Sequence, residues 1–185
     1  MIRKVVQSGN AVLRQIAKNV SKVDKKTLSI VTDLKDTLKT QKEPEGVGLA
    51  APQIGKSVRI FIADYKASLP SNGKNFQRVV INPEILKSSE TKGKGLKTKS
   101  RKEILEGCLS LPYYYGPLKR AGRVTLKYLD EKGEEITEEF TDFNAQIIMH
   151  EIDHLNGILF VDRLLEEKKP LYKVDGDEWE EVELS

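Results

Sequence analysis

The sequence predicts an α+β fold, because helical and strand patterns occupy separate stretches of the chain. Residues 24–43 carry apolar side chains at helical spacing, and residues 142–157 do so again. Between them, residues 57–65 and 78–86 are apolar enough for strands, and residues 122–141 show the apolar and polar alternation that is typical of a hairpin. A regular strand–helix–strand order is absent. We therefore expect N-terminal helices with antiparallel or mixed β-sheets rather than a parallel sheet.

The composition is that of a folded protein of one domain. Of its 185 residues, 38% are hydrophobic and 32% are charged, and no apolar run approaches the roughly 18 residues that a membrane span needs. The single cysteine, Cys108, excludes an internal disulfide, and a net charge of +3 is too small to indicate nucleic-acid binding. The first residues lack the apolar stretch of a secretory signal and the composition of an organellar presequence, so a cytoplasmic location is expected.

Two helices are predicted near the N-terminus. Residues 10–20 form a short helix with Asn10 as its cap, and residues 24–43 form a longer one with Asp24 as its N-cap. Pro44 follows the longer helix and ends it. Its apolar stripe consists of Leu28, Val31, Leu34 and Leu38.

Strands are predicted over residues 57–65 and 78–86, the second with an interruption at Pro83. Residues 122–141 are predicted to form a hairpin, because two alternating arms flank the turn sequence DEKGE. The last stretch, residues 171–184, has an Asp-Gly pair between two short arms, which predicts a small acidic hairpin.

The last predicted helix, residues 142–157, contains both histidines of the chain. Asp142 is its expected cap and Gly157 its expected C-terminal stop. His150 and His154 are four positions apart, which places them about 40° apart around the helix and about 6 Å apart along it. Their imidazoles therefore project side by side and can meet one metal ion.

Glu151 follows the first histidine and completes the pattern H-E-x-x-H. In this pattern the histidines bind a metal that acidifies a water molecule, and the glutamate accepts the proton. The alternative is a pair of surface or hydrogen-bonded core histidines, which is the commoner case at this spacing. The intervening glutamate and the apolar setting favour a metal. We therefore expect the sheets to pack around a central metal-binding HExxH helix.

A catalytic metal needs a third protein ligand and one open position. One group of zinc proteases uses a third histidine soon after the motif, but Phe160 stands at that position here. The chain has no other histidine, so the third ligand is a cysteine or a carboxylate. Cys108, in LEGCLSLP, and Glu178 are the two alternatives. A position in an acidic tail makes Glu178 the weaker one.

The stretch GVGLAAPQIG, residues 46–55, places three glycines and two alanines around the amide side chain of Gln53. This composition predicts a backbone that approaches another group closely. It is not the phosphate-binding pattern G-x-G-x-x-G, because the third glycine is absent. By itself the stretch is equally consistent with a tight turn that carries a surface Gln53.

In this order along the chain, GVGLAAPQ, EGCLS and HEIDH resemble the three signature motifs of the peptide deformylase family. The resemblance implies a hydrolase that removes the formyl group from the N-terminal formylmethionine of newly synthesised polypeptides and releases formate. It also implies one divalent metal ion, Fe²⁺ in the native form, which Zn²⁺, Ni²⁺ or Co²⁺ can replace. We expect a catalytic domain over residues 1–165 and an acidic C-terminal extension, not a separate domain, over residues 166–185.

Residue by residue, the resemblance implies that Cys108, His150 and His154 are the metal ligands. Glu151 would be the general base and then the general acid. This assignment selects the cysteine rather than a carboxylate as the third ligand.

The other implied contacts surround the reacting carbonyl. Gln53 and the backbone N–H of Leu109 would stabilise the oxyanion, and Gly48 would make a backbone contact to the substrate. Ile147 and Leu111 are expected to line an apolar pocket for methionine, with an ordinary core position as the alternative for both.

The segment 88–102 is strongly basic and longer than is usual for the family before its cysteine motif. It is either a solvated surface loop or a contact with ribosomal RNA. The expected partners are formylmethionyl nascent peptides and, transiently, the ribosome, with no membrane and no specific nucleic-acid sequence. Arg120 is expected to pair with Glu106, with a solvated Arg120 as the alternative.

Two other functions stay open on the sequence alone. One is an HExxH-type metallopeptidase with Glu178 as the third ligand. The other is a non-enzymatic metal-binding or RNA-binding module. Hydrolysis of a formylated but not an unformylated methionyl peptide separates the deformylase from both.

Overall fold

The computed structural model describes residues 1–43, 45–65, 76–89 and 105–183. Most of the basic segment 88–102 therefore lies outside the described residues. No helix in the described part of the chain is long and apolar enough to cross a bilayer.

The larger sheet is antiparallel, as predicted, and has the strand order β1-β2-β3-β6-β7. Its strands are β1 (Gly48–Ala50), β2 (Ile60–Tyr65), β3 (Phe76–Ser88), β6 (Arg123–Leu129) and β7 (Glu135–Thr141). The hairpin predicted over residues 122–141 is confirmed as β6 and β7. The interruption predicted at Pro83 is confirmed as a register shift between Ile81 and Glu84, where Asn82 has a φ of 51°.

The smaller sheet is also antiparallel and has the order β4-β5-β8-β9. Its strands are β4 (Leu105–Cys108), β5 (Leu111–Pro117), β8 (Leu171–Asp175) and β9 (Glu178–Val182). The C-terminal hairpin was predicted, whereas β4, β5 and the helix α3 (Phe160–Glu167) were not. The hairpin joins the same sheet as the cysteine-bearing strand β4.

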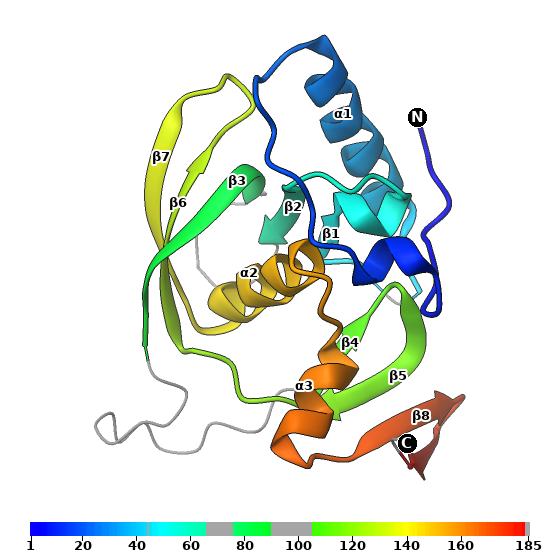
Figure 1. Cartoon of the computed structure of the whole chain (residues 1–185). Coiled ribbons are helices and arrows are strands. Elements are labelled where there is room, and N and C mark those ends of the chain that lie inside the picture. The colour runs from blue at the N-terminus through cyan, green and yellow to red at the C-terminus, as the bar shows by residue number, and fades with distance from the viewer. Residues whose placement is uncertain (44, 66–75, 90–104, 184–185) are drawn as a thin grey trace.

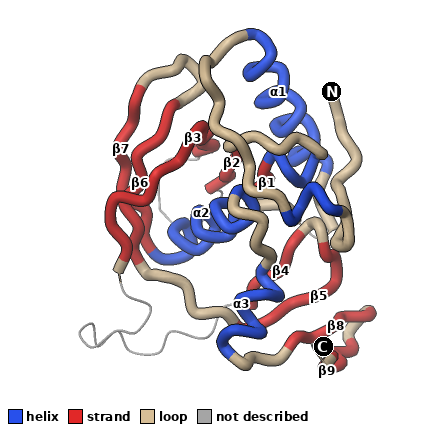
Figure 2. The backbone as a smooth tube through the Cα atoms, viewed as in Figure 1, coloured by secondary structure: helices blue, strands red, loops and turns tan. Residues whose placement is uncertain are grey.

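Helix α2 (Asp142–Leu155) lies between the two sheets, with α1 (Lys25–Thr40) packed nearby on the larger sheet (Figures 1 and 2). The apolar side chains of α2 join the core of the larger sheet because they recur on one face of this helix. The members of this core that belong to α2 are Ala145, Ile147, Ile148, Ile152 and Leu155. The opposite side of α2 faces β4, and this orientation positions the site described below.

The predicted helix ends are mostly confirmed. Asp24 caps α1 by accepting a hydrogen bond from the Thr27 N–H at 2.9 Å. Gly157 follows α2 with a φ of 73°, a left-handed conformation that a glycine adopts without strain. The predicted cap Asp142 was wrong, because Thr141 is the N-cap and Asp142 is already the first helical residue.

The first predicted helix was too long. Only one 3₁₀ turn, η1 (Ala11–Arg14), forms within residues 10–20, and Asn10 caps it as expected by accepting from the Val12 N–H. The motif GVGLAAPQIG forms the short strand β1 followed by a second 3₁₀ turn, η2 (Ala51–Ile54). The tight turn that was one interpretation of this motif is therefore present, and a short strand lies within the same motif.

Candidate metal centre

Cys108 and the two histidines form one cluster at the interface of β4 and α2. The Cys108 Sγ lies 3.2 Å from His154 Nε2, and one ligand atom from each of Cys108, His150 and His154 lies within 4.8 Å of the others. Cys108 and His154 are buried, and the His150 ring meets the His154 ring edge-on. One thiol and two imidazoles in this space are a donor set that suits zinc or ferrous iron.

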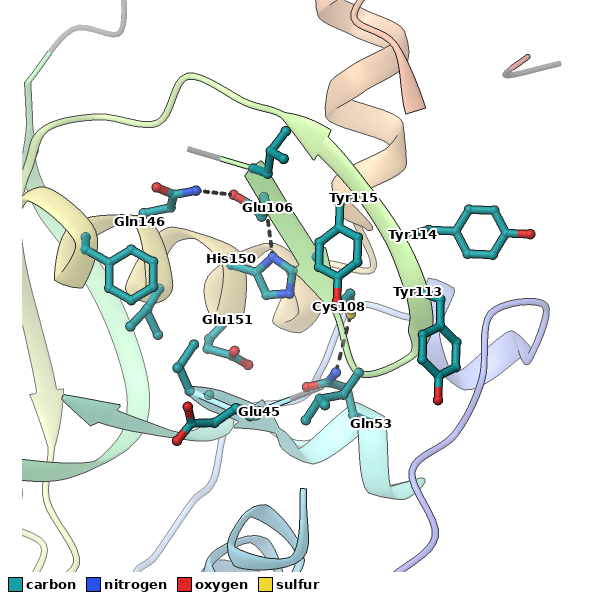
Figure 3. A pocket seen from close by; sticks show the side chains of 18 residues that line it. Glu45, Gln53, Glu106, Cys108, Tyr113, Tyr114, Tyr115, Gln146, His150 and Glu151 are labelled. Atoms are coloured by element: carbon teal, nitrogen blue, oxygen red, sulfur yellow. Dashed lines mark hydrogen bonds and ion pairs between the residues drawn. The ribbon is translucent and has the colours of Figure 1, made fainter. Parts of the chain in front are cut away.

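A carboxylate orients the more exposed histidine. Glu106 Oε1 lies 2.7 Å from His150 Nδ1, so the other ring nitrogen, Nε2, is left available for a metal (Figure 3). Gln146 donates a further hydrogen bond to Glu106 at 3.3 Å. A carboxylate behind a ligating histidine is the common arrangement at metal sites, because it fixes the tautomer and the ring orientation.

A buried chain of charges extends from this carboxylate. Arg120 donates to Glu106 through Nε at 2.9 Å and through Nη2 at 2.6 Å, and its Nη1 donates to Asp153 at 2.6 Å. Arg163 also pairs with Asp153, at 2.8 Å. The predicted pairing of Arg120 with Glu106 is confirmed. The role of Asp153 was not foreseen, because its position in the motif carries no signal beyond a charge.

The cluster shifts the pKa values of its own members. Burial raises the pKa of the Cys108 thiol, but the neighbouring His154 and His150 outweigh burial and hold it well below its usual range. Burial also raises the pKa of Glu106, yet Arg120 and His150 lower it strongly, so this carboxylate stays ionised. A thiolate beside a fixed carboxylate is the state in which such a cluster binds a cation.

Glu151 is the buried carboxylate of the cavity. Burial raises its pKa to about 7, with smaller opposing effects from the two histidines. Within the described part of the chain, its Oε2 is buried and has no hydrogen-bond partner. A carboxyl group with a pKa near neutrality can both accept and return a proton under physiological conditions.

Gln53 is buried on the opposite wall and its orientation is fixed. The Ala50 N–H donates to Gln53 Oε1 at 2.8 Å, so the amide NH₂ group is the end that faces Cys108. That group donates to Ser110 Oγ at 3.2 Å and lies 3.6 Å from Cys108 Sγ. The surface position that was the alternative for Gln53 is therefore wrong.

The backbone at Gly48 passes directly in front of Glu151. A Cβ at Gly48 would overlap the Glu151 carboxylate, so any larger residue there would force this side chain to move. The glycine of the first motif, GVGLAAPQ, thus leaves room for the carboxylate of the third motif, HEIDH. Leu109 follows Cys108 at the end of β4 and is half-buried.

These groups enclose a cavity of about 200 Å³ (Figure 3). Ile147 lines it as predicted, whereas Leu111 does not and packs instead beside the core of α3 and β8. The apolar lining was largely missed from the sequence because it comes from four separate segments. It includes Val47, Leu105, Leu109, Tyr113, Tyr115, Phe143 and Ile147.

Two positions considered for a third ligand lie elsewhere. Glu178 is exposed on β9 and is not part of the Cys–His–His cluster. Phe160 begins α3, is buried, and places its ring centroid 6.5 Å from that of His150. It therefore packs against a member of the cluster from the position where the protease pattern would have a histidine.

The chain matches the family model of polypeptide deformylase over residues 2–170. The chain belongs to the polypeptide deformylase family. A peptide deformylase of Pseudothermotoga lettingae is 44% identical over 88% of this chain and 82% of that protein. The crystal structure of the peptide deformylase from Thermotoga maritima has a TM-score of 0.70 and 34% identity, over 88% of this chain and 97% of that one.

A Met-Ala-Ser-bound peptide deformylase from Acinetobacter baumannii has a TM-score of 0.70 and 34% identity, over 88% of this chain and 98% of that one. The mixed α and β architecture with antiparallel sheets is that of the family. The chain is a metal-dependent hydrolase that removes the N-formyl group from nascent polypeptides. The HExxH metallopeptidase and the non-enzymatic module are not supported.

Proposed function

We propose that Cys108, His150 and His154 hold the catalytic metal of this deformylase. The proposal is supported by the convergence of their ligand atoms within 4.8 Å and by the lowered pKa of the Cys108 thiol. The Glu106 carboxylate behind His150 supports it further, because that contact leaves one ring nitrogen for the ion. In this proposal α2 is the central metal-binding helix.

A divalent metal held there supplies Lewis-acid chemistry, namely polarisation of the formyl carbonyl and acidification of water. Glu151 accepts a proton from the attacking water and delivers it to the leaving nitrogen as the C–N bond breaks, so that formate departs and the free amine remains. The raised pKa of Glu151, about 7, suits both transfers. Its burial also keeps competing bulk water from the carboxylate.

Gln53 and the backbone N–H of Leu109 donate to the charge that develops on the carbonyl oxygen. The Ala50 contact turns the Gln53 amide so that its NH₂ group faces the cluster, which supports this role. One well-placed donor of this kind is typically worth about 3 kcal/mol of transition-state stabilisation. The Gly48 backbone contacts the substrate, and the absence of a side chain lets both substrate and Glu151 occupy the same wall.

The apolar wall receives the methionine side chain. Ile147 is buried in this wall, and Leu105, Leu109 and Phe143 complete it. An unbranched thioether fits such an irregular apolar space because it has three rotatable bonds. The related Acinetobacter baumannii protein, which binds Met-Ala-Ser, supports a peptide of this kind as the ligand.

We propose Fe²⁺ as the native ion, with Zn²⁺, Ni²⁺ or Co²⁺ as functional replacements. A mixed thiolate and imidazole donor set accepts all four. If the ion is iron, the protein purified without oxygen contains iron by elemental analysis, and exposure to air lowers its activity because the iron and the thiolate are oxidised. Full activity after aerobic storage of an iron-loaded sample would exclude iron as the native metal.

We further propose residues 1–165 as the catalytic domain and 166–185 as an acidic extension of it, acting in the cytoplasm on nascent chains. Pairing of β8 with β5 supports an extension rather than a separate domain. Transient ribosome contact through the basic segment 88–102 stays a prediction from charge alone. Deleting residues 91–100 lowers co-sedimentation with ribosomes at low salt if that contact exists, and leaves it unchanged if the segment is a solvated loop.

The observation that carries the proposed site is the meeting of Cys108 with the histidine pair. The direct test is formate release from formyl-Met-Ala-Ser after loading with ferrous, nickel or zinc ion. We expect release that depends on the added metal and no hydrolysis of unformylated Met-Ala-Ser. Cleavage of the unformylated peptide would contradict the proposal.

A further inference from the structure

The smaller sheet has one covered face and one open face. Leu171 and Tyr114 lie on the covered face and pack with Phe160 and Leu164 of α3. Side chains alternate between faces along a strand, and residues paired across an antiparallel ladder share a face. Tyr115 pairs with Tyr172, and Val174 pairs with Trp179, so these side chains project from the other face.

Three aromatic residues of the open face, Tyr115, Tyr172 and Trp179, form what we call the aromatic shelf. The ring centroids of Tyr115 and Trp179 are 5.8 Å apart, and those of Tyr172 and Trp179 are 6.3 Å apart. Trp179 is 52% exposed, which is unusual for the largest apolar side chain and indicates a contact surface.

The shelf is continuous with the cavity. Tyr115 lines the cavity and lies across Gly107, where a Cβ would approach within 2.6 Å of its ring (Figure 3). From there the shelf leads over β8 to Trp179 on the outermost strand, β9. A ligand that leaves the cavity past Tyr115 therefore meets Trp179 next.

The shelf lies in an acidic environment. Residues 171–183 contain six acidic side chains and one lysine, Lys173. Glu181 pairs with Tyr172 and so lies on the shelf face, whereas Glu180 pairs with Lys173 on the covered face. An exposed indole beside a carboxylate attracts a guanidinium or ammonium group, through cation–π contact and charge.

We propose that the aromatic shelf binds the residues downstream of formylmethionine and favours nascent peptides that carry arginine or lysine there. The inference rests on the proposed function, because the cavity must hold the formylmethionine. Two strand spacings separate β5 from β9, about 10 Å, which an extended peptide covers in about three residues. The preferred cationic side chains are therefore at the fourth and fifth positions of the substrate.

The experiment compares formyl-Met-Ala-Ser-Arg-Arg with formyl-Met-Ala-Ser-Glu-Glu at low salt, using the metal-loaded full chain. We expect kcat/KM to be about two- to fivefold higher for the arginine peptide, through a lower KM. The ratio of kcat/KM for the arginine peptide to kcat/KM for the glutamate peptide is expected to fall to near one in Trp179→Ala. The same ratio is expected to be reduced in Glu181→Gln. Glu180→Gln removes the same charge from the covered face and keeps the wild-type ratio.

Trp179 is the single tryptophan of the chain, so its fluorescence reports directly on the shelf. Titration with the product Met-Ala-Ser-Arg-Arg changes its emission, whereas Met-Ala-Ser, which is too short to reach it, does not. Three results would each contradict peptide binding by the aromatic shelf. They are a wild-type kcat/KM ratio near one, an unchanged ratio in Trp179→Ala, and identical fluorescence changes with both products. The proposed function fails instead if the wild-type enzyme releases no formate from formyl-Met-Ala-Ser.

Discussion

The Cys108 Sγ lies 3.2 Å from His154 Nε2, although 46 positions separate the two residues in the chain. Neither residue is a metal site by itself. Strand β4 brings the Cys108 thiol to the buried side of α2. There the two imidazoles lower the pKa of the thiol.

Replacing Cys108 by Ala is expected to remove the metal. Two imidazoles remain, and two ligands do not hold a catalytic ion. Elemental analysis of the purified variant measures the loss. Ser110→Ala, which alters a neighbouring side chain in the same segment, serves as the control and retains the metal. Full metal occupancy in Cys108→Ala would show that another residue supplies the third ligand.

Replacing Glu151 by Gln is expected to leave the metal bound and to reduce kcat by about 10²–10⁴-fold, because the proton acceptor is lost. Formate release and metal content are measured on the same preparation. Glu45→Gln changes another carboxylate on the cavity wall and keeps most of the activity. A near-normal kcat for formate release in metal-loaded Glu151→Gln would show that Glu151 is not the proton acceptor.

Replacing Gly48 by Ala is expected to reduce kcat by at least about tenfold, the loss that follows when a catalytic group is misplaced. The new Cβ overlaps the Glu151 carboxylate, which must move. The double variant Gly48→Ala/Glu151→Gln tests this route, because two changes that act through one carboxylate do not add. Additive losses would instead indicate that Gly48 acts only through its backbone contact to substrate.

Replacing Arg120 by Met is expected to lower the free energy of unfolding by about 3–5 kcal/mol, because the buried Glu106 loses its arginine partner and the buried Asp153 keeps only Arg163. Arg163→Met is the control. Its side chain is 33% exposed, and the expected cost is about 0–1 kcal/mol. Urea unfolding of both variants measures the difference. Equal losses in the free energy of unfolding would mean that the buried charges of Glu106 and Asp153 do not depend on Arg120 more than on Arg163.

Asp33 is expected to stabilise the fold only above its acidic range. Burial raises its pKa, but hydrogen bonds from the Met1 amino group and Arg3 outweigh burial and lower it. A carboxyl group whose pKa is lower in the folded state stabilises it above the unfolded value, about 3.9, and this contribution is lost as the pH falls through the folded value.

The melting temperature of Asp33→Asn should therefore lie below that of the wild type at pH 6, and the gap should close as the pH falls below about 4. Asp36→Asn is the matched control, because Asp36 also contacts the Met1 amino group but is exposed. A gap that stays constant down to pH 2 would rule out a contribution from the Asp33 charge.

The sequence by itself determined the elements whose pattern is local. The helix α1, the hairpin of β6 and β7, and the side-by-side histidines of α2 were all predicted, because one buried face repeats along each of these segments. The three motifs also indicated the family. In each of these cases the signal lies within about twenty consecutive residues or in short unbroken strings of sequence.

Only the tertiary structure decided how those segments meet. Strands β4 and β5 were not predicted from the sequence. Glycine, cysteine and tyrosine residues that line the cavity dominate both strands, so the strands show no clear alternation of apolar and polar residues. Three contacts join residues that are far apart in sequence: the hydrogen bond from the Gln53 amide to Ser110, the close approach of Gly48 to Glu151, and the chain from His150 through Glu106 to Arg120. Burial raises the pKa of Glu151, and burial depends on the packing of the whole chain rather than on any one stretch of it.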